Sequence, residues 1–187
     1  MIRATVPAMN VFGLSAGPPA DYDDPLALLR AMHRQVLTRT GVLERVAALL
    51  PEPTRAAEAT AALPGLFAFF DDAWRLHCLD EDGSLFPRLH DLPELDALEC
   101  EHRALEAIYL ALRDVGTRLL APQGHTDAVL VEAFASHTRA LADGLAAHIA
   151  CEERLIFPHA DALPAPERRA IGLEMRLRRG GAPAPRG

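Results

Sequence analysis

The chain has 187 residues, of which half are apolar and 5% aromatic, and its formal net charge is −7 at pH 7. This length fits one domain with a sizeable core, and abundant Ala and Leu with few β-branched residues favour helix over sheet. The negative charge argues against a nucleic-acid partner. Three cysteines are too few for a disulfide framework, which favours a cytoplasmic location. The sequence has no apolar run long enough to predict a membrane span.

The first expected segment is an irregular N-terminal arm over residues 1–22, which hold several Pro and Gly and no periodicity. A helix start follows at Asp23-Asp24-Pro25, because an acidic cap there precedes a proline in the first turn. Apolar residues at helical spacing extend this first helix to about Leu50. Residues 54–62 then predict a helical fragment that Pro64-Gly65 interrupts. Whether the fragment joins the next helix through a kink stays open.

The second helix carries the apolar periodicity onward and ends near Pro87. A third helix begins at Pro93-Glu94 and ends before Pro122, and a fourth runs over about residues 126–157. Four long amphipathic helices with short connections predict an all-α, up-down-up-down four-helix bundle. The expected domains are the arm, the bundle, and a short C-terminal helix (about 165–178) with a flexible tail; their ranges are 1–22, 23–160 and 161–187.

One motif occurs twice in the chain. Residues 77–87 and 148–158 both read H-x-x-x-E-[DE]-x-x-[LI]-F-P, so each places a His and a Glu one helical turn apart, just before a Phe-Pro helix stop. A lone histidine precedes each copy on the preceding helix, His33 before the first and His102 before the second. The spacings between histidines, 44 and 46 residues, are nearly equal. The chain therefore looks internally duplicated.

Chance alone explains part of this pattern. Random order of this composition gives about half of one H-x-x-x-E spacing, whereas four occur. We set aside His90/Glu94, because Pro93 lies between them and the segment resembles a loop. A single interior histidine is most often a hydrogen-bonded core residue. That interpretation becomes hard to sustain for four histidines on four facing helices.

The depth of these residues in the expected bundle is the next test. His33 and His102 lie early in their helices, whereas His77 and His148 lie late in theirs. In an antiparallel bundle these positions share one end, with Glu81 and Glu152 about one turn further toward that end. Two carboxylates among four imidazoles suit a pair of metal ions, which would also offset the cost of burying charge. Mixed nitrogen and oxygen ligands without thiolate favour iron, and also suit manganese or zinc.

With these residues the sequence resembles the hemerythrin family, in particular its bacterial H-H-E cation-binding domains, over about residues 23–160. The resemblance implies a four-helix bundle that holds two iron ions with an oxo or hydroxo bridge and binds oxygen or related small molecules. By analogy, His33 and His77 serve one iron and His102 and His148 the other. Glu81 and Glu152 would then bridge the two.

The chain departs from the oxygen-carrying members of that family at two points. Those members have a second histidine one turn after the third-helix histidine, where this chain has Glu106, and they close the fourth-helix motif with Asp rather than Glu152. If Glu106 ligates, an anionic oxygen replaces a neutral imidazole and stabilises ferric iron. Our hypothesis is a site that oxidises readily and carries oxygen poorly. Asp82 and Glu153 have two interpretations: they hydrogen-bond the ligand imidazoles, or they simply face solvent.

The predicted function is that of a non-haem di-iron protein that handles O2, NO or peroxide. The metal ligands would be His33, His77, Glu81, His102, Glu106, His148 and Glu152, and no catalytic side chain is assigned. The alternatives are a di-iron oxidoreductase of peroxidase or ferroxidase type, an iron or redox sensor, and a metal-free helical domain. The residues do not identify a protein redox partner.

Overall fold

The computed structural model describes residues 21–89, 91–121 and 126–180, and these form helices and turns with no strand among them. The expected all-α class is confirmed for this part of the chain. Most of the expected N-terminal arm, and the end of the expected C-terminal tail, lie outside the described residues. Within the described ranges, no helix combines the length and the apolar character that crossing a membrane requires.

The first long helix, α1, spans Pro25–Leu49 and begins at the predicted acidic cap. The side chain of Asp24 accepts a hydrogen bond from the backbone N–H of Ala27 at 3.1 Å, which satisfies one of the unpaired donors of the first turn. The buried face of α1 carries apolar residues together with His33. Such a face packs against other elements, so His33 lies in the interior.

The second long stretch is assembled from several helical segments. The expected break near Pro64-Gly65 is confirmed, because one short helix ends at Thr60 and the next begins at Leu63 with Pro64 in its first turn. Proline is tolerated in the first turn because the N–H that it lacks would have no partner inside the helix. The segments in order are α2 (Ala56–Thr60), α3 (Leu63–Ala68), the π-helical turn η1 (Phe69–Trp74), α4 (Arg75–Asp80), the π-helical turn η2 (Glu81–Leu85) and the 3₁₀ turn η3 (Phe86–Arg88).

The third and fourth stretches lie where the sequence predicts them, with one correction at the end of the fourth. The Phe157-Pro158 pair does not stop the helix, because the chain widens into a π-helical turn and then continues with proline again in a first turn. The final helix matches the expected residues 165–178. The elements are α5 (Leu95–Leu119), α6 (Ala128–Cys151), the π-helical turn η5 (Glu152–Ile156), α7 (Phe157–Asp161) and α8 (Ala165–Arg178).

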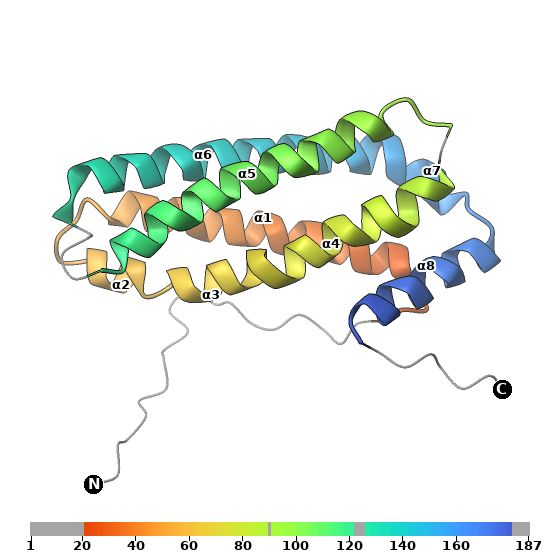
Figure 1. Ribbon diagram of the computed structural model, residues 1–187, viewed down its shortest axis with the longest axis horizontal. Coiled ribbons are helices and arrows are strands. Elements are labelled where there is room, and N and C mark those ends of the chain that lie inside the picture. The colour runs from red at the N-terminus through yellow and green to blue at the C-terminus, as the bar shows by residue number, and fades with distance from the viewer. Residues whose placement is uncertain (1–20, 90, 122–125, 181–187) are drawn as a thin grey trace, which may run out of the picture.

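Figure 1 shows α1, the α3–α4 stretch, α5 and α6 lying lengthwise along the molecule, with successive stretches running in opposite directions. Helix α6 packs against both α1 and α5. Helix α8 returns to the end of the molecule where α4 finishes, and it contacts both α1 and α4. Helix α8 therefore covers the carboxyl end of α4 and the amino end of α1.

The apolar interior is divided into two clusters. The larger cluster includes Val46, Phe70, Leu112 and Phe134, and the smaller one includes residues nearer the α8 end of the molecule, such as Leu29, Leu85, Leu98 and Ile156. On α1, His33 lies between residues of the two clusters, and on α5 His102 does the same. A buried polar layer thus crosses the core at one level, and it contains the histidines that the sequence singles out.

Candidate metal centre

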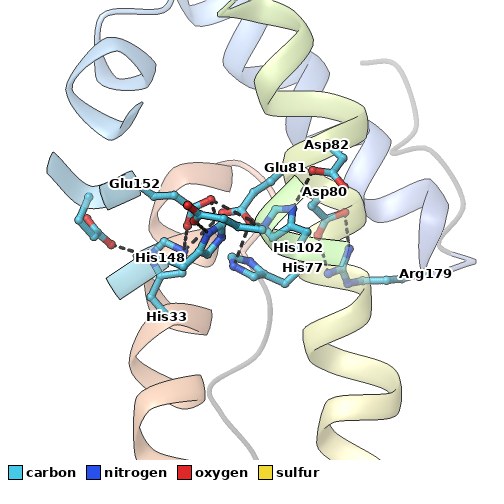
Figure 2. A network of polar contacts seen from close by, with 11 residues as sticks. His33, His77, Asp80, Glu81, Asp82, His102, His148, Glu152 and Arg179 are labelled. Atoms are coloured by element: carbon cyan, nitrogen blue, oxygen red, sulfur yellow. Dashed lines mark hydrogen bonds and ion pairs between the residues drawn. The ribbon is translucent and has the colours of Figure 1, made fainter. Parts of the chain in front are cut away.

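Six side chains that the sequence predicts as ligands lie together in the buried polar layer (Figure 2). The histidines come from α1, α4, α5 and α6, and the two glutamates begin the π-helical turns η2 and η5. Each imidazole is at most 5% exposed, and both glutamates are fully buried. The six residues are His33, His77, Glu81, His102, His148 and Glu152.

The two carboxylates lie at the middle of this group and each faces imidazoles from both halves of the repeat. Glu81 lies 3.2 Å from Nε2 of His77 and 3.4 Å from Nε2 of His33, measured from its nearest oxygen in each case. Glu152 lies 3.3 Å from Nε2 of His148 and 3.2 Å from Nε2 of His33. His102 Nε2 is further away, at 3.5 Å from Glu81 and 3.8 Å from Glu152.

These side chains form two groups in which the donor atoms lie within 4.8 Å of one another. The first group is His33, His77, Glu81 and Glu152, and the second is His102, His148 and Glu152. Glu152 belongs to both, so its two oxygens could serve two ions. All four carboxylate oxygens, and Nε2 of His33 and of His148, are buried without a hydrogen bond. Buried polar atoms without partners are costly, and cations coordinated by these atoms would remove that cost.

Three of the four imidazoles are held from behind by a carboxylate on a neighbouring helix. Nδ1 of His33 lies 2.7 Å from Glu153, that of His102 lies 2.8 Å from Asp82, and that of His148 lies 2.8 Å from Glu101. Such a contact keeps the Nδ1 proton in place and directs Nε2 toward the interior. Of the two interpretations of Asp82 and Glu153, the structure confirms the one in which they hydrogen-bond imidazoles. Glu101 was not predicted, because nothing in the sequence distinguishes it from solvent-facing glutamates on the same helix.

The Phe-Pro pairs shape the site, and only the first of them also lies at the end of its helical stretch, which finishes at Arg88. Pro87 and Pro158 lack an N–H, and their rings would clash with the carbonyl four residues earlier, which disfavours a regular helix at these points. The backbone widens instead, and the N–H groups of Phe86 and Phe157 donate to the carbonyls of Glu81 and Glu152, five residues earlier.

Each of these phenylalanines packs on a histidine from the other half of the repeat. The ring centroid of Phe86 lies 6.0 Å from that of His102, and the ring centroid of Phe157 lies 5.3 Å from that of His33. The apolar rings close the α8 end of the polar layer, and the duplicated motif gives the site an approximate internal symmetry.

The charges in this layer strongly perturb its titration. Burial alone would lower the pKa of His33, but the carboxylates of Glu152 and Glu81 outweigh burial and raise it to about 10. Burial would raise the pKa of Glu81, but the imidazoles around it, with His77 the strongest, hold the pKa well below its ordinary value. Burial lowers the pKa of His77. Burial and Glu81 would raise the pKa of Glu152, but hydrogen bonds from His148 and His33 lower it. Both carboxylates therefore stay ionised and attract positive charge, which protons or metal cations can supply.

Glu106 is the one expected ligand that the structure does not bring to this layer. Its side chain is exposed on α5 and belongs to neither group of donors. Glu106 follows His102 by one turn, as Glu81 follows His77 and Glu152 follows His148, but at this position on α5 the side chain faces solvent. It borders a pocket of about 240 Å3 with Trp74, Cys78, Asp82 and His102. Burial raises the pKa of the Cys78 thiol to about 11, so this cysteine is a thiol rather than a reactive thiolate.

A second unpredicted feature fixes α8 beside the site. Asp80 is fully buried and forms ion pairs with two arginines of the C-terminal region, at 2.5 Å to Arg178 and 2.6 Å to Arg179. A basic stretch near the end of a chain is usually a solvated, frayed helix end, but these two arginines are held by a buried carboxylate. Ion pairs with residues about 100 positions away leave no local signal in the chain.

Comparisons with protein-family models, with curated proteins and with solved structures find no match to this chain.

Proposed function

We propose that this protein is a non-haem di-iron protein of the hemerythrin type, built as an up-down-up-down four-helix bundle, which binds O2, NO or peroxide. The observation that supports the proposal most is the pair of donor groups that share Glu152, with buried donor atoms that lack hydrogen bonds. The nitrogen and oxygen donor set without thiolate suits iron better than a structural zinc site. The carboxylates behind three of the imidazoles are the usual supports of metal-bound histidine.

Each of the two donor groups would hold one ion. His33, His77, Glu81 and Glu152 would hold one ion, and His102, His148 and Glu152 the other. Iron at such a site supplies redox chemistry and open coordination positions for a small ligand. The second group has three protein ligands against four in the first. We therefore place the exchangeable ligand on the His102 side, where the pocket bordered by Cys78 and Glu106 approaches the layer.

The alternative is a di-iron oxidoreductase of peroxidase or ferroxidase type. The incomplete ligand set of the second group supports it, because open positions next to protein carboxylates suit peroxide activation. Turnover with peroxide and a reductant separates this activity from simple ligand binding.

The direct experiment is metal analysis of protein reconstituted with Fe2+ without oxygen, followed by optical spectra after addition of O2, NO or peroxide. We expect about two iron ions per chain, the number of donor groups, and a spectral change that saturates with at least one of the ligands. Protein treated with a chelator is the control. Iron bound at less than one ion per chain, or spectra that no ligand alters, would overturn the proposal.

A further inference from the structure

One histidine of the buried layer lacks the support that the other three have. His77 is 4% exposed, its Nε2 faces Glu81 at 3.2 Å, and its Nδ1 is buried without a hydrogen-bond partner. A histidine that binds metal through Nε2 carries its proton on Nδ1, so this atom is then a donor with no acceptor. Buried donors in native proteins are almost always paired. An acceptor from outside the chain would complete the site.

The internal repeat shows where that acceptor belongs. The two halves support their histidines in the same way, since Asp82, next to Glu81, binds His102, and Glu153, next to Glu152, binds His33. In the second half, Glu101, the residue before His102, supports His148. The matching residue in the first half is the one before His33, and it is Met32. The first half therefore has the thioether of Met32 at the position where the second half has the carboxylate of Glu101.

A pocket occupies the corresponding place in the structure. It has a volume of about 180 Å3, and both His77 and Met32 line it. Leu28 and Met175 add apolar wall, and Gln35 and Arg179 add polar groups. Helix α8 contributes Met175 and its C-cap is Arg179, so the pocket lies between α1, α4 and the C-terminal helix.

We propose that this pocket binds a small aliphatic carboxylate, which takes the place that Glu101 occupies in the other half of the molecule. One carboxylate oxygen accepts the Nδ1 proton of His77, and the short alkyl chain lies against Met32, Leu28 and Met175. Asp80 and Arg179 both line the pocket. The charge of Asp80 is more than offset, because it pairs with Arg178 as well as with Arg179, so the three residues together carry a net positive charge that favours an anion. An engineered apolar cavity of about 150 Å3 holds benzene, so a pocket of this size suits an acid of a few carbons.

The proposal depends on the proposed function in one respect, since metal at Nε2 is what fixes the proton on Nδ1 of His77. Zinc-loaded protein is therefore the form to test, and zinc also avoids any redox change. Metal content is measured first, so that failure to bind metal is distinguished from failure to bind the acid.

The test is calorimetric titration of sodium butyrate into zinc-loaded protein, with ligand-observed NMR as a second measurement. We expect saturable binding of one butyrate per chain, weakened about 10- to 100-fold in M32E, whose own carboxylate would occupy the position. M32L, the matched control, keeps the apolar wall and should bind as the unmodified protein does. R179Q removes the cationic group that lines the pocket and should also weaken binding. Its zinc content is measured alongside, because Arg179 also pairs with Asp80, the residue before Glu81.

Two results would overturn the proposal. One is zinc-loaded protein that shows no saturable butyrate binding, as expected if water alone occupies the pocket. The other is M32E and R179Q that both bind butyrate as tightly as M32L does.

Discussion

The two buried glutamates differ in importance, although the repeated motif makes them look equivalent. Glu152 belongs to both donor groups and Glu81 to one. Replacing Glu152 by Gln leaves His33, His77 and Glu81 in the first group but only two imidazoles in the second. Replacing Glu81 by Gln leaves three donors in each. We therefore expect E152Q to lose one of two iron ions and E81Q to retain both with reduced affinity.

The size of the effect follows from linkage between metal binding and folding. An ion present at 100 times its dissociation constant stabilises the folded state by about 2.7 kcal/mol. For a chain of this length, 1 kcal/mol moves the Tm by about 2–4 °C, so losing one ion should reduce the metal-induced rise in Tm by roughly 5 to 11 °C. Comparing metal-loaded and metal-free forms of each variant removes the effect of the substitution on the metal-free fold.

The iron content of E152Q, E81Q and E106Q is measured after each is prepared without oxygen. The Tm of each variant is then measured in its metal-loaded and metal-free forms. E106Q is the matched control, because Glu106 lies on α5 one turn from His102 but is exposed and outside both groups. It should keep two ions and the full rise in Tm. The reasoning is refuted if E152Q binds as much iron as E81Q, and the structure's exclusion of Glu106 is refuted if E106Q loses an ion.

Three further predictions follow from the same contacts. The metal-free protein should lose stability as the pH rises from about 6.5 to about 10, because protonated His33 stabilises the fold and loses its proton over this range. Urea midpoints should fall with pH in the metal-free protein and fall less in the metal-loaded protein. An equal fall in the two forms would contradict this prediction. The variants D82N, E153Q and E101Q should each weaken metal binding about 10- to 100-fold, because each removes the carboxylate that hydrogen-bonds Nδ1 of one imidazole. Competition with a chelator measures the metal affinity. Unchanged affinity in all three variants would contradict the prediction. D80N should destabilise the protein by about 2–4 kcal/mol and expose α8 to protease, because it breaks the buried ion pairs to Arg178 and Arg179. If D80N resists protease as well as the unmodified protein does, Asp80 does not hold α8 in place.

Much of the helical framework follows from local signals in the chain. The cap at Asp24 and the apolar periodicity place α1, and the same kind of pattern places α5, α6 and α8 within a few residues of their ends. The common depth of the four histidines follows from helix length and direction alone, and the histidines do lie in one layer around the two glutamates. These features depend on short-range physics, which the sequence displays directly.

Other features depend on contacts between distant parts of the chain. The π-helical turns at Glu81 and Glu152 arise because Pro87 and Pro158 follow in a helix that tertiary packing keeps going. Glu101 and Glu106 are both acidic residues on α5, and only the packing of α6 against α5 shows that Glu101 reaches a histidine. The pairing of Asp80 with Arg178 and Arg179 likewise appears only when α8 folds back on α4.

The central claim is that six side chains hold a pair of iron ions. Anomalous diffraction at the iron edge, from crystals of protein loaded with Fe2+, tests it most directly. The account predicts two iron peaks within the layer formed by His33, His77, Glu81, His102, His148 and Glu152, both in contact with Glu152. A single peak, no peak in that layer, or iron bound only at the surface would contradict it.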